Sequence, residues 1–346
     1  MTMYNVGMKS LDASALLTTP NLELNIKKVE AELEKVLHID NPAINHPLKR
    51  LIHAHSKRLR PMFVLAVAQS QGVKIDESVI RGCVAIELVH IGSLVHDDII
   101  DEASTRWRVP TINSQEGIAQ AIVIGDYLFA KSFEQASKIN QEVAGLIGLS
   151  LTNLCDGQSR EMADQYNLSR SLKSMKKAHW GKTAALFSAA CQIGGLCAGL
   201  TKTQVDALAK FGENFGLSFQ LIDDLLDLLS TNDLSGKPVG NDVVEGIYTL
   251  PILLSLNGPS ARKLTSLLKK GSKINQTLLI ELLDNDGSFQ KTVNLIHKYN
   301  TTASLALDTL KPTPGILELK DLPKKYFTLA LKHYVAKENQ SIIADL

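Results

Sequence analysis

Apolar residues recur at helical spacing along almost the whole chain, and the alternation of apolar and polar residues that is typical of β-strands is scarce. The spacing predicts one charged, amphipathic helix near the N-terminus, followed by longer and more apolar helices, at residues 25–37, 75–101, 115–138, 141–164, 171–200 and 203–229. The segment 75–101 is apolar on nearly every side, which is typical of a helix buried inside a bundle.

Glycine and proline separate these segments, at Pro110 and in the stretches 236–238, 257–259 and 312–315. After residue 259 the predicted helices become shorter and richer in lysine and asparagine. We therefore expect an all-α helical bundle that forms one domain over residues 1–346. Its long central helices, at about 45–260, should line a cavity, and the shorter C-terminal helices, at about 261–346, should pack outside them.

Composition narrows the class of protein. A chain of 346 residues with 45% hydrophobic residues can form one large domain or two smaller ones. Its formal net charge of +1 gives no electrostatic argument for nucleic-acid binding. Four cysteines lie in apolar surroundings without metal-ligand spacing, so we expect reduced, buried thiols in a cytoplasmic protein: Cys83, Cys155, Cys191 and Cys197. We expect neither a signal peptide at the N-terminus nor a transmembrane helix.

Two similar pentapeptides, DDIID at 97–101 and DDLLD at 223–227, carry the main chemical signal. Their carboxylates stand at positions i, i+1 and i+4, so in a helix the first and last lie on one face. Carboxylates that face an apolar core are unfavourable unless a cation compensates them. Mg²⁺, held by one or two carboxylates and by substrate phosphates, is the cation that fits. One such motif is usually a solvated helix face, but two copies in matching apolar contexts favour a polynuclear metal site that binds phosphate groups.

Several cations could meet the same phosphates. They are Lys57, Arg58, Arg60, Arg106, Arg108, Lys182 and Lys237. Each alone is more typical of a solvated surface, but Lys182 precedes an apolar stretch and Lys237 lies in a glycine-flanked loop. His90 lies two turns before Asp97, where it is either a core histidine or a ligand contact. The chain has no P-loop, no GxGxxG motif and no Ser-His-Asp arrangement.

In these motifs and basic residues, the chain resembles the trans-isoprenyl (polyprenyl) diphosphate synthase family. The matching stretches occur in the family's order and spacing, at residues 57–61, 87–101, 125–128, 182–183, 219–227, 236–242 and 249–251. Taken together they are highly specific, and the resemblance weakens before residue 45 and after about residue 260.

The resemblance implies an isoprenoid-synthase-type bundle whose cavity lies between two Asp-rich helices. Three Mg²⁺ ions would draw diphosphate off an allylic substrate, and the double bond of isopentenyl diphosphate would attack the resulting cation. By resemblance, the Mg²⁺ ligands are Asp97, Asp98, Asp101, Asp223, Asp224 and Asp227. The allylic diphosphate would contact Arg106, Lys182 and Lys237, and isopentenyl diphosphate would contact Lys57, Arg60 and His90. Thr183 and Gln220 would lie near the cation. The family also implies a homodimer, cytoplasmic or peripheral to the membrane when the product is long.

Three departures from the family pattern leave alternatives open. Trp107 stands where the family has a second arginine, His55-Ser56 replaces two glycines, and Ile247 replaces a common lysine. Loss of one charge-assisted contact costs about 1.5–3 kcal/mol. Two alternatives therefore remain: a terpene cyclase that uses only a prenyl diphosphate, and a non-catalytic subunit of a heteromeric synthase.

The length of the prenyl product is expected to depend on the helix face that leads away from the first Asp motif. Ser93 lies one turn before Asp97, Gly92 is beside it, and Val89 lies two turns before. In the family, an aromatic residue at the position of Gly92 or Ser93 stops the growing tail early. The small residues here predict a product longer than C20. The alternative for Gly92 is that it lets a neighbouring helix pack closely.

Overall fold

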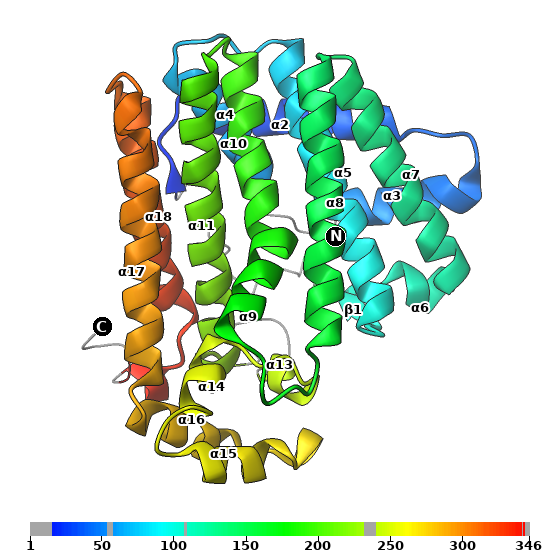
Figure 1. The fold of residues 1–346 in the computed structure, drawn as a ribbon. Helices are drawn as coiled ribbons and strands as arrows, with labels where there is room; N and C mark the ends of the chain where they lie inside the picture. Colours follow the sequence, from blue (N-terminus) through cyan, green and yellow to red (C-terminus); the bar gives the residue numbers. More distant parts are fainter. Residues whose placement is uncertain (1–15, 54–57, 107–108, 232–239, 341, 343–346) are drawn as a thin grey trace.

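Helices make up nearly all of the regular structure. The computed structural model describes residues 16–53, 58–106, 109–231, 240–340 and 342 (Figure 1). The helices from the N-terminus to the centre are α2 (Leu22–Leu37), α3 (Pro42–His53), α4 (Leu59–Ser70), α5 (Glu77–Ile100), α6 (Ile112–Glu116), α7 (Ile118–Ser137), α8 (Gln141–Ala163), α9 (Leu172–His179), a π-helical turn (Trp180–Ala184), α10 (Ala185–Cys197) and α11 (Lys202–Leu229). The remaining helices are α13 (Asn241–Val244), α14 (Leu250–Ser255), α15 (Ala261–Leu268), α16 (Gln276–Asn285), α17 (Ser288–Ala306) and α18 (Pro314–Tyr334). The prediction of an all-α bundle is confirmed.

A two-stranded antiparallel hairpin is the exception within the described ranges. It joins β1 (Thr105–Arg106) to β2 (Val109–Pro110) directly after α5. Single turns of 3₁₀-helix occur at Gly271–Lys273, Leu307–Thr309 and Lys337–Asn339.

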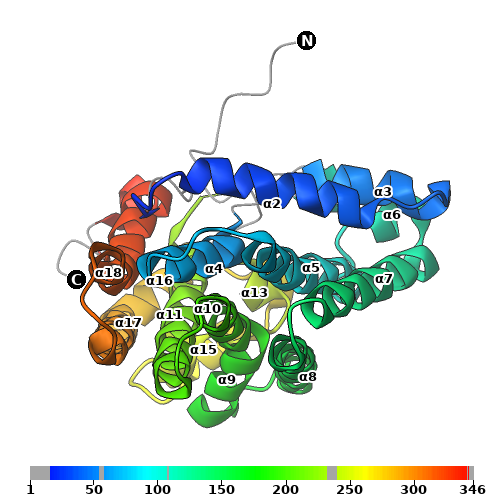
Figure 2. The ribbon, with the colours of Figure 1, turned by 90° about the horizontal axis from the view of Figure 1, so that it is seen from above.

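Helices α5 and α11 run in the same direction through the bundle, and both Asp motifs fall near their C-terminal ends, on the side of the bundle that faces α13 and α14 (Figure 1). Both helices have defined starts. The Asp76 side chain accepts a hydrogen bond from the Val79 amide at 3.1 Å, and Thr201 forms a capping box with Gln204. Seen from above, α4 and α10 lie in the middle of the bundle, α2 and α3 cross one side of it, and α7 and α18 lie at opposite edges (Figure 2).

Two of the predicted central helices are interrupted. The segment 115–138 is divided between α6 and α7 at Gly117, whose φ of +87° suits glycine and ends the first helix. The segment 171–200 runs from α9 into α10 through the π-helical turn, which holds Lys182 and Thr183. Such turns are frequent at functional sites.

The expectation of short helices after residue 260 is wrong for α17 and α18, which have 19 and 21 residues. Lysine and asparagine in these helices lie mostly on the outer face. A buried stripe that includes Phe289, Val293 and Ile296 attaches α17 to α11 along its length. Composition averaged over both faces therefore concealed two strongly amphipathic helices.

Two further expectations concern burial. Cys155 is exposed on α8, so the prediction of four buried thiols is wrong for this residue. Cys83 and Cys191 are buried, and Cys197 is only partly buried. Helix α5 is the one helix of the described chain that has the length and hydropathy of a membrane span. Because 72% of its most apolar window is buried inside the bundle, α5 packs as a core helix.

Candidate active site

The first Asp motif lies at the C-terminal end of α5, where the chain turns into the β-hairpin. Asp98 is buried, Asp97 is half-buried, and Asp101 is exposed at the helix end. The hairpin returns Arg106 to the motif, and its Nε donates a hydrogen bond of 2.7 Å to Asp98 Oδ1. Burial raises the pKa of both Asp97 and Asp98, although nearby cations oppose the shift.

The second motif is held by a chain of hydrogen bonds. The Thr183 hydroxyl donates to Gln220 Oε1 at 2.6 Å, and Gln220 Nε2 donates to Asp224 Oδ1 at 3.0 Å. Asp224 and Asp227 are buried, whereas Asp223 is exposed. Burial raises the pKa of Asp224 well above its usual range, despite the hydrogen bond from Gln220. Because Asp101 and Asp223 are exposed, the expectation that all six carboxylates face the core is wrong for these two.

Lys182 reaches the space between the motifs because two glycines allow close helix packing. A Cβ on Gly157 of α8 would lie 2.4 Å from the Lys182 amide nitrogen, and one on Gly181 would lie 2.4 Å from the Asn153 carbonyl oxygen. This approach places Glu161, one turn after Gly157, against the Lys182 ammonium group, to which it is ion-paired.

Lys182, Glu161 and His179 form a cluster of titratable side chains between the two motifs. Burial would lower the Lys182 pKa, but Glu161 and Asp97 outweigh burial and raise it. Burial would likewise raise the Glu161 pKa, but the charge of Lys182 and its hydrogen bond lower it. Burial lowers the pKa of His179 to about 4, so its ring is neutral near pH 7. His179 Nε2 lies 3.6 Å from Asp224 Oδ2.

Glu161 and His179 were not identified from the sequence. His179 stands three residues before Lys182 and therefore on the same helix face, which is a signal that spacing alone could have given. Glu161 has no comparable local signal, because its role depends on the approach of α8 to the π-helical turn.

The motif carboxylates suit divalent cations. Asp224 Oδ2 is buried and has no hydrogen-bond partner among the described residues. In the part of the chain that the structure describes, no three acidic, histidine or cysteine side chains are close enough together to enclose a metal ion by themselves. Mg²⁺ does not need such a group, because it takes one or two carboxylates and completes its shell with water and substrate phosphates. The residues present therefore fit a Mg²⁺ site completed by a diphosphate.

A second basic region lies beside the first motif. The charges of Arg60, Arg106 and Arg58, together with burial as the largest cause, lower the pKa of His90 well below its usual range. The Arg60 guanidinium lies 4.7 Å from the ring centroid of Phe187. Burial lowers the Arg60 pKa to about 10, and its Nε has no hydrogen-bond partner within the described ranges. This region suits an anion, which would restore the lost solvation of Arg60.

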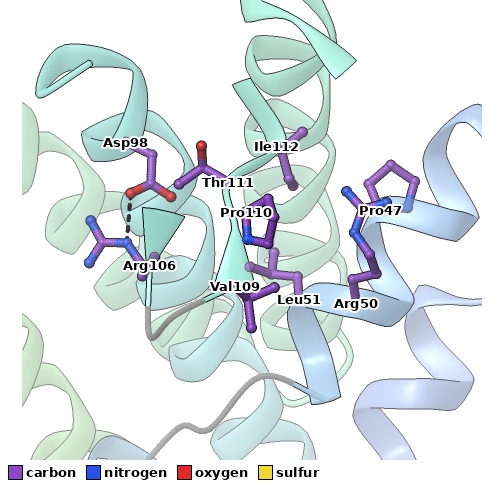
Figure 3. A pocket seen from close by; sticks show the side chains of 9 residues that line it. All are labelled: Pro47, Arg50, Leu51, Asp98, Arg106, Val109, Pro110, Thr111 and Ile112. Atoms are coloured by element: carbon purple, nitrogen blue, oxygen red, sulfur yellow. Dashed lines mark hydrogen bonds and ion pairs between the residues drawn. The ribbon is translucent and has the colours of Figure 1, made fainter. Parts of the chain in front are cut away.

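Six of the residues singled out from the sequence lie outside the described residues: His55, Ser56, Lys57, Trp107, Arg108 and Lys237. Next to the site, a pocket opens between α3 and the hairpin (Figure 3), lined by Pro47, Arg50, Leu51, Asp98, Arg106, Val109, Pro110, Thr111 and Ile112. Its Arg50 is ion-paired with Glu116 at 2.7 Å.

The three residues predicted to set chain length have different surroundings. A Cβ on Gly92 would lie 2.7 Å from Phe129 Cε1, so Gly92 faces α7 and allows close packing, which was the alternative considered. Ser93 is buried on the helix face that leads to Asp97, and its hydroxyl donates to the His90 carbonyl oxygen at 2.8 Å. Val89 is fully buried.

The chain is similar to known proteins in both sequence and structure. A family profile described as Polyprenyl synthetase matches residues 41–282. "Heptaprenyl diphosphate synthase component 2" of Bacillus subtilis (strain 168) is 32% identical over 288 residues, which cover 83% of this chain and 82% of that protein. The decaprenyl diphosphate synthase of Rhodobacter capsulatus superposes with a TM-score of 0.84 at 28% identity, covering 92% of this chain and 99% of that one.

A second similar structure contains bound ligands. The polyprenyl synthase of Caulobacter crescentus CB15, complexed with calcium and isoprenyl diphosphate, superposes with a TM-score of 0.83 at 26% identity, covering 94% of this chain and 99% of that one. Geranylgeranyl diphosphate synthases are also among the similar proteins.

Proposed function

The chain belongs to the polyprenyl synthetase family, and from this we propose that it is a trans-polyprenyl diphosphate synthase. It is a prenyltransferase that condenses an allylic prenyl diphosphate with isopentenyl diphosphate in a Mg²⁺-dependent reaction. The observation that carries the proposal is the placement of both Asp motifs on the same side of the bundle, joined through the cluster of Lys182, Glu161 and His179.

The allylic diphosphate would bind between the two motifs. Three Mg²⁺ ions per site would be held by Asp97, Asp98, Asp101, Asp223, Asp224 and Asp227. When bound, they would stabilise the negative charge that develops on the departing diphosphate. Lys182 and Arg106 add positive charge on the same side, and Lys237 is assigned there by resemblance.

The second substrate would bind in the basic region beside the first motif. Arg60 and His90 would orient isopentenyl diphosphate there, together with Lys57, so that its double bond faces the allylic carbon. The Thr183 hydroxyl and Gln220 oxygen atoms would lie next to the cation. Apolar side chains of α4, α5 and α11 would keep water away from it.

The release of inorganic diphosphate tests this function. A synthase releases one inorganic diphosphate for each isopentenyl diphosphate consumed, from farnesyl diphosphate in the first condensation and from the elongated allylic diphosphate in each later one. It releases little without isopentenyl diphosphate. A terpene cyclase, the alternative that Trp107 and Ile247 raise, would release diphosphate from the allylic substrate alone. A heteromeric subunit, which the name "component 2" of the Bacillus relative favours, would release none until a second chain is added.

For the assembly we propose a homodimer that packs through α7. Four apolar side chains on this helix are about half exposed or more, with Ile118 at 59% and Phe133 at 50%; the others are Ile122 and Val123. A face of this kind is typical of an interface between chains.

Replacement of Phe133 by glutamate is expected to shift the protein from dimer to monomer in sedimentation equilibrium. A buried charge at the centre of an apolar interface is not compensated there. Leu305→Glu is the control, because Leu305 is 60% exposed on α17 at the opposite edge. A wild-type protein that sediments as a monomer would contradict the homodimer, as would a Phe133→Glu variant that remains a dimer.

We propose that the product is longer than C20 and that its tail passes Ser93. Ser93→Phe is expected to shorten the main product towards C15 or C20, because the ring fills the space one turn from Asp97. Gly92→Phe is a poor test because any side chain there meets Phe129. Ser93→Ala, which adds no volume, should keep the wild-type product. Thin-layer chromatography of the dephosphorylated products would show this, and an unchanged distribution in a folded Ser93→Phe variant would refute the path.

A further inference from the structure

The C-terminal helix α18 contributes a side chain to the edge of the site, although it lies beyond the residues that the family profile matches. Helix α18 packs against both α4 and α11. Its Tyr326 is buried, and its ring stacks on Phe219 of α11 with 5.2 Å between centroids and an angle of 27° between planes. A second ring, that of Phe215, meets Tyr326 at 5.8 Å in an edge-on arrangement.

The ring of Phe219 is not an isolated core residue. It lies 5.2 Å from Phe187, and Phe187 carries the Arg60 guanidinium at 4.7 Å. Phe219 also directly precedes Gln220, which bonds both Thr183 and Asp224. These contacts form a continuous row, which we call the aromatic row. It runs from Tyr326 on the C-terminal helix through Phe219 and Phe187 to Arg60, the side chain assigned to isopentenyl diphosphate.

Ring contacts restrict the orientation of each ring in the row. Tyr326 stacks on one face of Phe219, which limits the rotamers that Phe219 can adopt. Phe219 meets Phe187 in a tilted arrangement, with 52° between the ring planes, and this contact limits Phe187 in turn. The planar Arg60 guanidinium is held over Phe187 and must present its N–H groups at a fixed angle to bind a diphosphate in two places. Without the Tyr326 ring, Phe219 and then Phe187 would be less ordered, and Arg60 would pack on a less ordered Phe187 ring.

We infer that Tyr326 is a positioning residue for isopentenyl diphosphate, acting through Phe219 and Phe187 on Arg60. This inference rests on the proposed function, because it assigns the second substrate to Arg60. The Tyr326 ring, and not its hydroxyl group, would have this role. Burial raises the Tyr326 pKa well above its usual range, with Asp223 adding to the shift, so the group stays protonated.

The helix offers a matched control for the test. Phe327 is the next residue, it is buried to the same extent, with 6% exposure for each, and its ring contacts His297 on α17 at 5.0 Å instead of the row. Replacement of either aromatic residue by leucine removes a similar buried ring from the same helix, so the two variants should lose similar stability.

The experiment measures KM for both substrates in four variants. Tyr326→Leu and Tyr326→Met, whose unbranched side chain adapts more easily to the space left by the ring, are expected to raise KM for isopentenyl diphosphate about tenfold, which corresponds to about 1.4 kcal/mol, while KM for farnesyl diphosphate changes less than twofold. Tyr326→Phe, which keeps the ring, and Phe327→Leu should both match wild type.

Each other outcome overturns the inference. It fails if a folded Tyr326→Leu or Tyr326→Met has the wild-type KM for isopentenyl diphosphate, or if both substrates lose affinity equally. It also fails if Phe327→Leu has the same effect, or if Tyr326→Phe does. Failure of the proposed function is distinct, because wild-type protein would then consume no isopentenyl diphosphate at all.

Discussion

Replacement of Asp97 by asparagine is expected to lower turnover by about 10²- to 10³-fold or more, and Asp223→Asn should do the same. Each change keeps the shape of the side chain but removes a negative charge from one of the two Asp motifs. Because the motifs sit on different helices, equal losses at Asp97 and Asp223 would show that both hold the same reaction centre. EDTA should abolish turnover in wild type, and added Mg²⁺ should restore it.

A steady-state assay with farnesyl and isopentenyl diphosphates measures this loss, and circular dichroism checks that the helices are intact. Asp206→Asn is the matched control, since Asp206 lies on α11 well before the motif, in an exposed ion pair with Lys202. Near-normal turnover of Asp97→Asn or Asp223→Asn, or full activity in EDTA, would rule out the metal site.

Asp224→Asn should have opposite effects on activity and on the stability of the metal-free protein. Turnover should fall as strongly as for Asp97. The free energy of unfolding in EDTA should rise, because burial holds the Asp224 pKa well above its usual range. A pKa that is raised on folding contributes stability at low pH, and this contribution is lost as pH rises through the folded-state pKa. Near neutral pH the carboxylate therefore destabilises the fold, and the neutral amide removes that cost.

Thermal unfolding in EDTA between pH 5 and 8 tests this sign. The melting temperature of Asp224→Asn should exceed that of wild type by an amount that grows with pH, and each 1 kcal/mol corresponds to about 2–4 °C in chains of 150–250 residues. Asparagine can still accept the bond from Gln220, so packing is preserved. Mg²⁺ with inorganic diphosphate should stabilise wild type more than the variant. A variant that melts below wild type in EDTA at every pH would refute the account of Asp224.

The sequence predicted the central helices and the two Asp motifs because both signals are local. Apolar spacing marks α5, α8 and α11 to within a few residues, and the i, i+1, i+4 pattern places each set of carboxylates. Arg106 was also identified from the sequence, and the hairpin that follows α5 brings it back to Asp98.

Features that depend on the approach of two distant segments were missed. Glu161 meets Lys182 only because Gly157 and Gly181 let α8 contact the π-helical turn. Gly92 looked open from the sequence, but Phe129 of another helix covers it. Tyr326 lies in a region where the family motifs end, so nothing local indicated that its ring reaches Phe219.

The mass spectrum of the lipid products tests the central claim most directly. Wild-type protein, Mg²⁺ and farnesyl diphosphate should give diphosphate esters longer by successive C5 units, extending beyond C20, when isopentenyl diphosphate is present, and no new product when it is absent. A cyclic hydrocarbon formed from farnesyl diphosphate alone, with isopentenyl diphosphate left unconsumed, would contradict the assignment as a polyprenyl diphosphate synthase.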